Sequence, residues 1–521
     1  MLHAQDTLTC LNHYWGYPDL RPAQKPVIAE VMQGNSALVI MPTGGGKSMC
    51  YQLPAMLRSG LTLVISPLIA LMKDQVDDLR LKGIDAAYLN SSQSTGESNL
   101  IFNAIGDGKM KLLYIAPERL MSLKGALLER LKTIQIDMIA VDEAHCISSW
   151  GHDFRPAYTK LKDLSTHFPD TPVLALTATA DDATKRDIIR QLGLENAALF
   201  ENSFDRPEIH YSAQARTDEV TQLLGFVAEH PSDSGIVYCL SRKRTQEMAD
   251  HLKAAGYKAE CYHAGLSSQE RMERQEQFIR DEINIMVATI AFGMGIDKAD
   301  VRFVFHADLP GSLDAYYQEI GRAGRDGAPA VAHMVFGAQD INMRHRFIDQ
   351  EFSDEERRRR EHGRLGALVA YCEAPTCRRQ TLLSYFGEPS DPCGNCDLCL
   401  DTTERLDGTS EACLALAAVQ ETGNRFGATY IIEFLLGKAT DKHQANRHDE
   451  QPGFGKGAEQ SKPFWQGLLR QMVGGGLLER DVSGFGGLTI TLKGQAVLNG
   501  KSRFEYRQMA APTDRTSRQE R

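Results

Sequence analysis

The stretch ALVIMPTGGGKS (37–48) joins an apolar run of strand length to a glycine-rich turn, and a helical pattern follows it. Glycines let successive backbone N–H groups converge on phosphate oxygens, while a lysine reaches the β- and γ-phosphates and a hydroxyl ligates Mg²⁺. The predicted phosphate cradle consists of Thr43, Gly44, Gly45, Gly46, Lys47 and Ser48. Met41 stands where the strict pattern has glycine. Taken alone, the stretch therefore leaves a plain glycine-rich turn open as the alternative.

A second stretch, MIAVDEAH (138–145), places two carboxylates at the end of an apolar run. Asp142 would hold the Mg²⁺ shell, and Glu143 would orient and deprotonate the attacking water. An acidic pair after a strand is usually only a solvated loop, but its position downstream of the glycine-rich turn favours catalysis. The two stretches together indicate hydrolysis of a nucleoside triphosphate.

A third stretch, QEIGRAGRDG (318–327), carries Arg322 and Arg325 at positions i and i+3. This spacing would place both side chains on one face of a helix. The γ-phosphate needs a cation, which a second lobe can supply across a cleft as an arginine finger. We predict that Arg325 is the finger and that Arg322 lies close to the phosphates, with ordinary surface charge as the alternative.

Apolar runs of strand length recur along the chain, each followed by a longer helical pattern. They occupy residues 37–41, 61–66, 111–116, 138–143 and 173–178, and, after SFDRP (203–207), residues 234–239, 283–289 and 301–306. Strands that alternate with helices predict parallel sheets built from βαβ units. The fold class is therefore α/β, with two lobes and a cleft between them. Beyond about Asp340 the pattern becomes helical.

The composition is that of an ordinary globular protein, with 521 residues, 42% hydrophobic residues and a net charge of −10. This length predicts several domains, at about 100–200 residues each. No apolar run of about 18 residues and no signal-peptide pattern is present, so we expect a cytoplasmic protein without a membrane partner. The acidic charge does not favour a nucleic-acid binder. Any DNA contact must therefore come from local patches.

Four cysteines near residue 390 have the spacing C-x15-C-x2-C-x2-C. They are Cys377, Cys393, Cys396 and Cys399. Four thiolates can close a tetrahedral structural Zn²⁺ site. Cys372 could compete as a ligand, but we interpret it as a core thiol. Reduced structural cysteines and a redox switch are the alternatives.

Together these motifs resemble the superfamily 2 helicases, and specifically the RecQ family of DNA helicases, from about residue 10 to about residue 500. The segment WGYPDLRPAQ (15–24) resembles the family's adenine-recognition motif. The resemblance implies that Tyr17 stacks on the base and that Arg21 and Gln24 bind or position the nucleotide. Further motifs of the family are similar to residues 66–75, 115–120, 176–180, 237–243 and 288–298.

The stretch HCISSWGHDFRPAY (145–158) follows the acidic pair directly. Exposed aromatic side chains can stack on unpaired bases at about 1–3 kcal/mol per base, although core packing is the alternative. The stretch resembles the aromatic-rich loop of RecQ helicases, which couples single-strand binding to ATP hydrolysis. The implied coupling residues are Trp150, His152, Phe154 and Arg155.

The resemblance also implies an order of domains. These are two RecA-like lobes (1–206 and 207–339), a helical zinc-binding subdomain (340–403), a winged-helix domain (404–503) and a disordered tail (504–521). Lys462 and Arg470, with Lys456 and Arg480, would contact phosphates, and Phe485 at a wing tip would either wedge at a duplex junction or pack. We expect no room for the family's usual C-terminal HRDC module before residue 521.

The resemblance implies an ATP- and Mg²⁺-dependent, Zn²⁺-containing DNA helicase that moves 3′ to 5′. We expect it to unwind duplex, forked and junction DNA in recombination, repair and replication-fork processing. Its partners would be single-stranded and duplex or junction DNA and a single-stranded-DNA-binding protein, near the nucleoid if the source is bacterial. An RNA helicase, a translocase and a junction-binding protein with a decayed ATPase are the alternatives.

Overall fold

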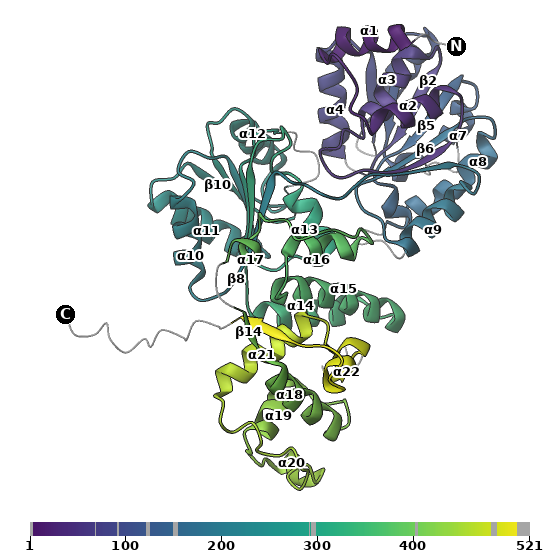
Figure 1. Ribbon diagram of the computed structural model, residues 1–521. Coiled ribbons are helices and arrows are strands. Elements are labelled where there is room, and N and C mark those ends of the chain that lie inside the picture. The colour runs from purple at the N-terminus through teal and green to yellow at the C-terminus, as the bar shows by residue number, and fades with distance from the viewer. Residues whose placement is uncertain are drawn as a thin grey trace.

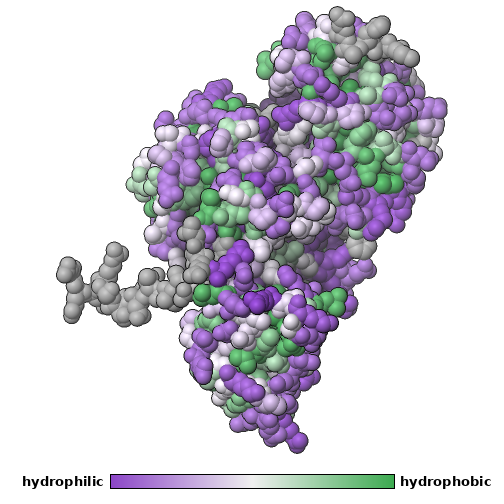
Figure 2. Space-filling view, in the orientation of Figure 1, coloured by the Kyte–Doolittle hydropathy of each residue, from purple (hydrophilic) through white to green (hydrophobic). Residues whose placement is uncertain are grey.

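The computed structural model describes residues 4–67, 69–90, 93–120, 126–148, 155–290, 292, 298–401, 405–480 and 487–507. Figure 1 shows two sheet-centred bodies, one purple to blue and one teal, with green helices and a yellow-green C-terminal part beyond them. On the face drawn in Figure 2, hydrophobic residues are interspersed with hydrophilic ones. Within the described ranges, no helix combines the length and apolar character needed to cross a membrane.

The first lobe is built on a seven-stranded parallel sheet in the order β3-β4-β2-β5-β6-β1-β7. Its strands are β1 (Ala37–Ile40), β2 (Leu61–Ile65), β3 (Ala86–Leu89), β4 (Leu112–Ile115), β5 (Ile136–Val141), β6 (Val173–Thr177) and β7 (Ala198–Glu201). Its helices are α1 (Ala4–Trp15), α2 (Gln24–Met32), α3 (Met49–Leu57), α4 (Ile69–Leu81), α5 (Thr95–Gly106), α6 (Pro117–Leu120), α7 (Ala126–Leu131), α8 (Leu164–His167) and α9 (Asp182–Leu192), with short 3₁₀ helices η2 (Ala144–Ile147) and η3 (Tyr158–Asp163). The central strands are buried on both faces, which explains their nearly continuous apolar sequence.

The second lobe repeats this plan with a six-stranded parallel sheet in the order β10-β11-β9-β12-β13-β8. Its strands are β8 (Ile209–Ala215), β9 (Gly235–Tyr238), β10 (Ala259–Tyr262), β11 (Ile285–Ala288), β12 (Phe303–His306) and β13 (Ala330–Phe336). Its helices are α10 (Glu219–Ala228), α11 (Arg242–Ala254), α12 (Ser268–Ile279) and α13 (Leu313–Ile320). The predicted α/β fold with two parallel-sheet lobes is confirmed.

A helical segment follows the second lobe, as the sequence predicts. It comprises α14 (Ala338–Glu351), α15 (Glu355–Glu373), α16 (Arg378–Tyr385) and α17 (Asp397–Leu400). Arg378 docks this segment on β8, because its guanidinium binds the Asp397 carboxylate (2.6 Å) and the Ala213 carbonyl (3.1 Å). Asp397 in turn accepts from the backbone N–H of Ala213 at 3.1 Å.

The C-terminal domain combines helices with two short antiparallel pairs of strands. Its elements are β14 (Arg405–Asp407), α18 (Thr409–Glu421), α19 (Ala428–Leu435), α20 (Asp441–Ala445), α21 (Lys462–Gly474), β15 (Leu478–Arg480), β16 (Leu488–Ile490), α22 (Leu492–Leu498) and β17 (Glu505–Arg507). β15 pairs with β16 as the predicted wing, and β14 pairs with β17. The wing tip, including Phe485, lies outside the described residues.

The predicted tail begins too early. Phe504 is buried, and β17 closes the domain against β14, so residues 504–507 belong to the fold rather than to a disordered segment. Hydrophobic burial of Phe504 gives these residues the contacts that a free tail lacks. Residues 508–521 lie outside the described residues.

Trp465 on α21 is central to the core of the C-terminal domain. The side chain is fully buried, and its indole N–H donates to the Gly457 carbonyl at 2.9 Å. We predict that Trp465→Ala destabilises this domain by roughly 3–5 kcal/mol, because it removes a large core side chain and leaves a cavity. Hydrogen exchange of α18, α19 and α21 measures the change. Gln466→Ala, at an exposed neighbouring position, is the control. Equal protection in both variants would contradict the assignment of Trp465 to the core.

Candidate nucleotide site, metal centre and DNA interface

The glycine-rich loop connects the end of β1 to the start of α3. Gly44 and Gly46 have positive φ angles of 81° and 82°, a conformation that glycine adopts without strain. The Gln24 side-chain amide donates to the Gly46 carbonyl at 3.0 Å, and Arg21 donates to the Gly44 carbonyl. Arg21 and Gln24 therefore hold the loop itself. Tyr17 is 55% exposed, which leaves its ring accessible for stacking.

Lys47 lies beneath this loop, where its ammonium donates to the carbonyls of Met41 (3.1 Å) and Pro42 (3.4 Å). Burial lowers the pKa of Lys47, whereas the carboxylates of Glu143 and Asp142 oppose that shift. Loop carbonyls and two carboxylates thus surround the cation on which the predicted phosphate contact depends. Ser48 follows it directly, immediately before α3.

The acidic pair follows β5, at the edge of the sheet where parallel strands place their carboxyl ends. Burial and the neighbouring Glu143 raise the pKa of Asp142 to about 7, and Lys47 acts in the opposite direction. A divalent cation beside Asp142 would favour the ionised form again. This buried carboxylate suits a metal ligand better than a solvated surface acid.

Glu143 adopts a left-handed conformation with a φ of 49°. Such strain in a non-glycine residue often accompanies function. One of its carboxylate oxygens, Oε2, is buried and lies 3.3 Å from Nδ1 of His145. Within the described ranges this oxygen has no hydrogen-bond partner, so it fits the predicted task of holding a water. The donor set of Lys47, Ser48, Asp142 and Glu143 therefore fits Mg²⁺ and a triphosphate.

Two further contacts around this pair were not predicted. His145 pairs with the Thr177 hydroxyl at 2.8 Å, which in turn donates to the Thr179 carbonyl at 2.9 Å. The Tyr158 hydroxyl donates to the Asp142 carbonyl at 3.0 Å. Tyr158 is the last residue of the aromatic-rich stretch that the sequence analysis quotes, so its proximity to the acidic pair could have been suspected.

Only part of the aromatic-rich stretch can be placed. Trp150, His152 and Phe154 lie outside the described residues, so their coupling role stays a prediction. The guanidinium of Arg155 donates to the Pro67 carbonyl at 2.8 Å, and its backbone N–H donates to the Cys146 carbonyl at 2.9 Å. Arg155 thus joins this stretch to the segment 66–75.

The second lobe brings Arg325 to the glycine-rich loop. An ideal Cβ on Gly44 would lie 3.4 Å from Cγ of Arg325, and the Arg325 charge contributes to lowering the pKa of Lys47. Arg322 is buried, and its side chain hydrogen-bonds with the Tyr238 side chain. The structure therefore places Arg325 beside the phosphate loop. The contact of Arg322 with Tyr238 lies within the second lobe, so the position of Arg322 near the phosphates stays a prediction.

The predicted helical placement of these arginines is wrong. α13 ends at Ile320, and both arginines lie in the turn that follows it. Gly324 between them has a φ of 61°, outside the helical region. Gly321 begins this turn, and a Cβ there would lie only 2.9 Å from Cβ of Thr43. The glycines thus replace a helical face with a tight turn that reaches the first lobe.

The four predicted zinc ligands converge within 4.8 Å of one another. The Sγ atoms of Cys377 and Cys396 are 3.9 Å apart, as are those of Cys393 and Cys399. Zn–S bonds of about 2.3 Å place tetrahedral sulfurs about 3.8 Å apart, so the geometry fits Zn²⁺. Cys372 is buried but not part of the cluster, as expected for a core thiol.

Backbone N–H groups donate to two of the cluster sulfurs. Burial raises the pKa of Cys377, but hydrogen bonds from the backbone N–H groups of Gln380 and Cys393 and from the thiols of Cys393 and Cys399 together bring it below its ordinary value. Burial raises the pKa of Cys393 and of Cys396. The N–H groups of Gln380 and Cys393 lie 3.5 and 3.2 Å from the Cys377 sulfur, and the N–H of Asn395 lies 3.3 Å from that of Cys393. Hydrogen bonds to sulfur favour the thiolates that zinc requires.

The predicted phosphate contacts of the C-terminal domain are exposed. Lys462 begins α21, and Arg470 lies further along the same helix, with its Nε donating to the Gln466 carbonyl at 3.1 Å. Both side chains are exposed, and their contact with DNA phosphates stays a prediction. Lys456 is exposed as well, whereas the side chain of Arg480 is outside the described residues.

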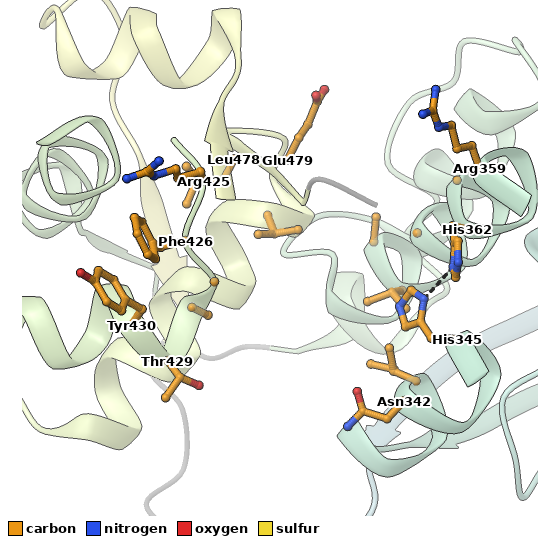
Figure 3. Close-up of a pocket in the computed structure, with 18 of the residues that line it drawn as sticks. Asn342, His345, Arg359, His362, Arg425, Phe426, Thr429, Tyr430, Leu478 and Glu479 are labelled. Carbon is orange, nitrogen blue, oxygen red and sulfur yellow. Dashed lines mark hydrogen bonds between the residues drawn. The ribbon is translucent and has the colours of Figure 1, made fainter. Parts of the chain in front are cut away.

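Sequence reasoning missed a groove of about 1510 Å³ between α14–α15 and the C-terminal domain. Figure 3 shows Arg425, Phe426 and Tyr430 on one side and His345 and His362 on the other, with the two histidines hydrogen-bonded. Neither Lys462 nor Arg470 lines this groove. Its lining comes from segments far apart in the chain, so no local sequence pattern could have indicated it.

Comparisons with known proteins agree with this architecture. Four family models match successive parts of the chain. They describe a DEAD/DEAH box helicase (21–188), a helicase conserved C-terminal domain (215–327), a RecQ zinc-binding domain (338–400) and an RQC domain (402–515). The fold also resembles the Mycobacterium smegmatis helicase Lhr bound to ssDNA and AMP-PNP. That likeness has a TM-score of 0.53 and 17% identity over 93% of this chain and 60% of that one.

Two bacterial relatives are similar over most of their length. The ATP-dependent DNA helicase RecQ of Pasteurella multocida is 43% identical over 95% of this chain and 78% of its own. The ATP-dependent DNA helicase RecQ of Bacillus subtilis is 39% identical over 99% of this chain and 87% of its own. With the nucleotide site, the zinc cluster and the paired lobes in place, the chain belongs to the RecQ family of ATP-dependent DNA helicases.

Proposed function

We propose that this chain couples ATP hydrolysis to 3′-to-5′ movement on single-stranded DNA and unwinds duplex, forked and junction DNA in recombination, repair and replication-fork processing. The observation that carries the proposal is the position of Arg325, in the second lobe, beside Gly44 in the first, where a Cβ on Gly44 would lie 3.4 Å from Cγ of Arg325. A nucleotide bound between these residues makes lobe closure depend on the γ-phosphate. Bacterial relatives named as ATP-dependent DNA helicases support the choice of DNA as substrate.

Each residue of the site has a defined task in this proposal. Lys47 leaves its loop carbonyls for the β- and γ-phosphates. Ser48 and Asp142 would hold Mg²⁺, which would supply positive charge beside the phosphates. Glu143 orients the attacking water and accepts its proton, while Arg325 stabilises charge on the transferred phosphoryl group. Tyr17 stacks on the adenine, whereas Arg21 and Gln24 act through the loop.

DNA binding is assigned to the regions that flank this motor. We propose that Trp150, His152 and Phe154 contact unpaired bases and that Arg155 ties their loop to the segment 66–75. Lys462 and Arg470 would contact duplex phosphates, and such contacts weaken as salt rises. The domain boundaries given above are kept as a proposal, with the C-terminal domain extended to include β17.

Partner and location are proposed from the same activity. A helicase that moves along single strands shares them with a single-stranded-DNA-binding protein, which is the protein partner we propose. We propose that the protein acts in the cytoplasm, at the nucleoid if the source is bacterial. Co-purification from cells, with and without nuclease treatment, distinguishes a direct protein contact from a shared DNA strand.

The test of the proposed function is ATP hydrolysis and strand separation by the unaltered protein. Single-stranded DNA is expected to stimulate hydrolysis strongly, and single-stranded RNA at the same salt concentration to do so weakly. A duplex with a 3′ overhang should unwind, whereas one with a 5′ overhang should not. Equal stimulation by RNA would favour an RNA helicase, and hydrolysis without strand separation would favour a translocase.

Lys47→Ala should reduce kcat for ATP hydrolysis by about 100-fold or more, because a preorganised cation at the transferred phosphoryl group is lost. The measurement is steady-state hydrolysis at saturating single-stranded DNA. Lys132→Ala removes a lysine in a surface ion pair with Glu129 and is expected to keep normal turnover. If kcat of Lys47→Ala were close to that of the unaltered protein, the assignment of this loop as a P-loop would be wrong.

Cys396→Ser should lower zinc content and thermal stability together, because serine offers a poor ligand to a closed tetrahedral thiolate site. The readouts are metal analysis of the purified protein and its melting temperature. Cys372→Ala is the matched control, since that thiol is buried but outside the cluster, and it should retain one zinc per chain. A full complement of zinc in Cys396→Ser would show that the ligand set is wrong.

A further inference from the structure

Arg206 joins the two halves of the nucleotide site, although no motif assigns it a task. It lies between β7 and β8 and is only 7% exposed. One terminal nitrogen, Nη1, donates to the carbonyls of Thr43 (3.0 Å) and Gly321 (3.2 Å). The other, Nη2, donates to the carbonyls of Ala323 (2.8 Å) and Gly324 (3.4 Å). One guanidinium thus binds the phosphate loop and the turn that carries Arg322 and Arg325.

The remaining donor of this guanidinium is also used, because Nε pairs with the Glu208 carboxylate. A buried cation is costly unless it is paired and hydrogen-bonded, and here every N–H direction of the planar fork has an acceptor. The fork geometry of arginine suits several carbonyls at fixed angles, which the single ammonium of lysine does not. The geometry of the guanidinium, and not only its positive charge, therefore matches the acceptors around Arg206.

The backbone on either side of Arg206 is held from outside the first lobe. The Phe204 ring stacks on Phe386, with the ring centres 4.4 Å apart, and the Tyr317 hydroxyl donates to the Phe204 carbonyl at 2.9 Å. Arg379, at the start of α16, donates to the Arg206 carbonyl at 3.1 Å. Glu388 accepts from the Phe204 backbone N–H at 2.8 Å. The zinc-binding segment therefore fixes the base from which Arg206 reaches the site.

Three of the backbone carbonyls bound by the Arg206 side chain belong to the arginine turn, and one belongs to the phosphate loop. A change in lobe separation would therefore act at Thr43 and be transmitted through one rigid side chain to the turn that ends at Arg325. A displacement of about 1 Å is enough to cost a catalytic group most of its effect. The bridge spans the cleft that closes and opens in each cycle of the proposed motor.

We propose that Arg206 is a positioning residue for ATP hydrolysis, which seats Arg325 against the phosphate loop by joining the Thr43 carbonyl to the turn 321–324. This inference rests on the proposed function, since it deepens the account of that same site. Arg206 does not need to touch the nucleotide in this role. It acts through Arg325, and this dependence gives the inference a specific test.

The test begins with Arg206→Ala, assayed for ATP hydrolysis at saturating single-stranded DNA. We expect kcat to fall about 10- to 100-fold while KM for ATP changes less than about threefold, because the loop still binds phosphates and only the finger is misplaced. Arg206→Lys should recover only part of the loss. Unchanged kcat in Arg206→Ala would overturn the inference, as would a loss confined to KM.

A double-variant comparison separates positioning from a merely structural role. If Arg206 acts through Arg325, Arg206→Ala should lower kcat no further in a chain that already carries Arg325→Ala. Multiplied losses would show independent action and overturn the inference. Arg58→Ala is the structural control, because Arg58 also binds carbonyls, those of Asp137 and Val31, but within the first lobe alone. It is expected to lower the melting temperature without a selective loss of kcat.

The unaltered chain distinguishes failure of the inference from failure of the function on which it rests. Absence of DNA-stimulated hydrolysis in the unaltered protein would overturn the proposed function and this role of Arg206 with it. Normal hydrolysis in both the unaltered chain and Arg206→Ala would overturn the role of Arg206 alone. Zinc content, measured in every variant, should remain at one per chain.

Discussion

The close approach of two backbone turns across the lobes is the constraint on which the site depends. Gly321 lies so near Thr43 that a single added carbon would clash, and a carbon added to Gly44 would touch Arg325. Neither lobe alone can surround a triphosphate, since Lys47 and the acidic pair come from one and the arginines from the other. The proposed coupling of hydrolysis to movement therefore depends on the place where these two turns meet.

Sequence reasoning worked best where the information is local. The eight apolar runs expected as strands all overlap strands of the two sheets, because buried parallel strands are apolar on both faces. The zinc ligands were also predictable, since three of them lie within seven residues of sequence (393–399). Short or half-polar strands were missed, such as β3 (AAYL) and β8 (IHYSAQA), where alanine or alternating polar residues weaken the apolar signal.

The errors and omissions at the site have a common physical cause. The i, i+3 spacing of Arg322 and Arg325 suggested a helix, but Gly321 and Gly324 favour a turn, and contact with the first lobe decides the outcome. Arg206 offered no signal at all, because the carbonyls that its guanidinium binds lie more than a hundred residues away along the chain, in both directions. Local spacing predicts which chemical groups are present, whereas tertiary contact determines how they are oriented.

The zinc-binding segment also supports the backbone around Arg206, in addition to its predicted role in binding zinc. Its cysteines order the start of α16 and the turn after it, and α16 carries Arg379, which grips the backbone carbonyls of Arg206 and Ile209. Phe386 and Glu388, just beyond α16, hold Phe204 from the other side. The proposed seating of Arg325 therefore depends on the order of this segment as well as on the two lobes.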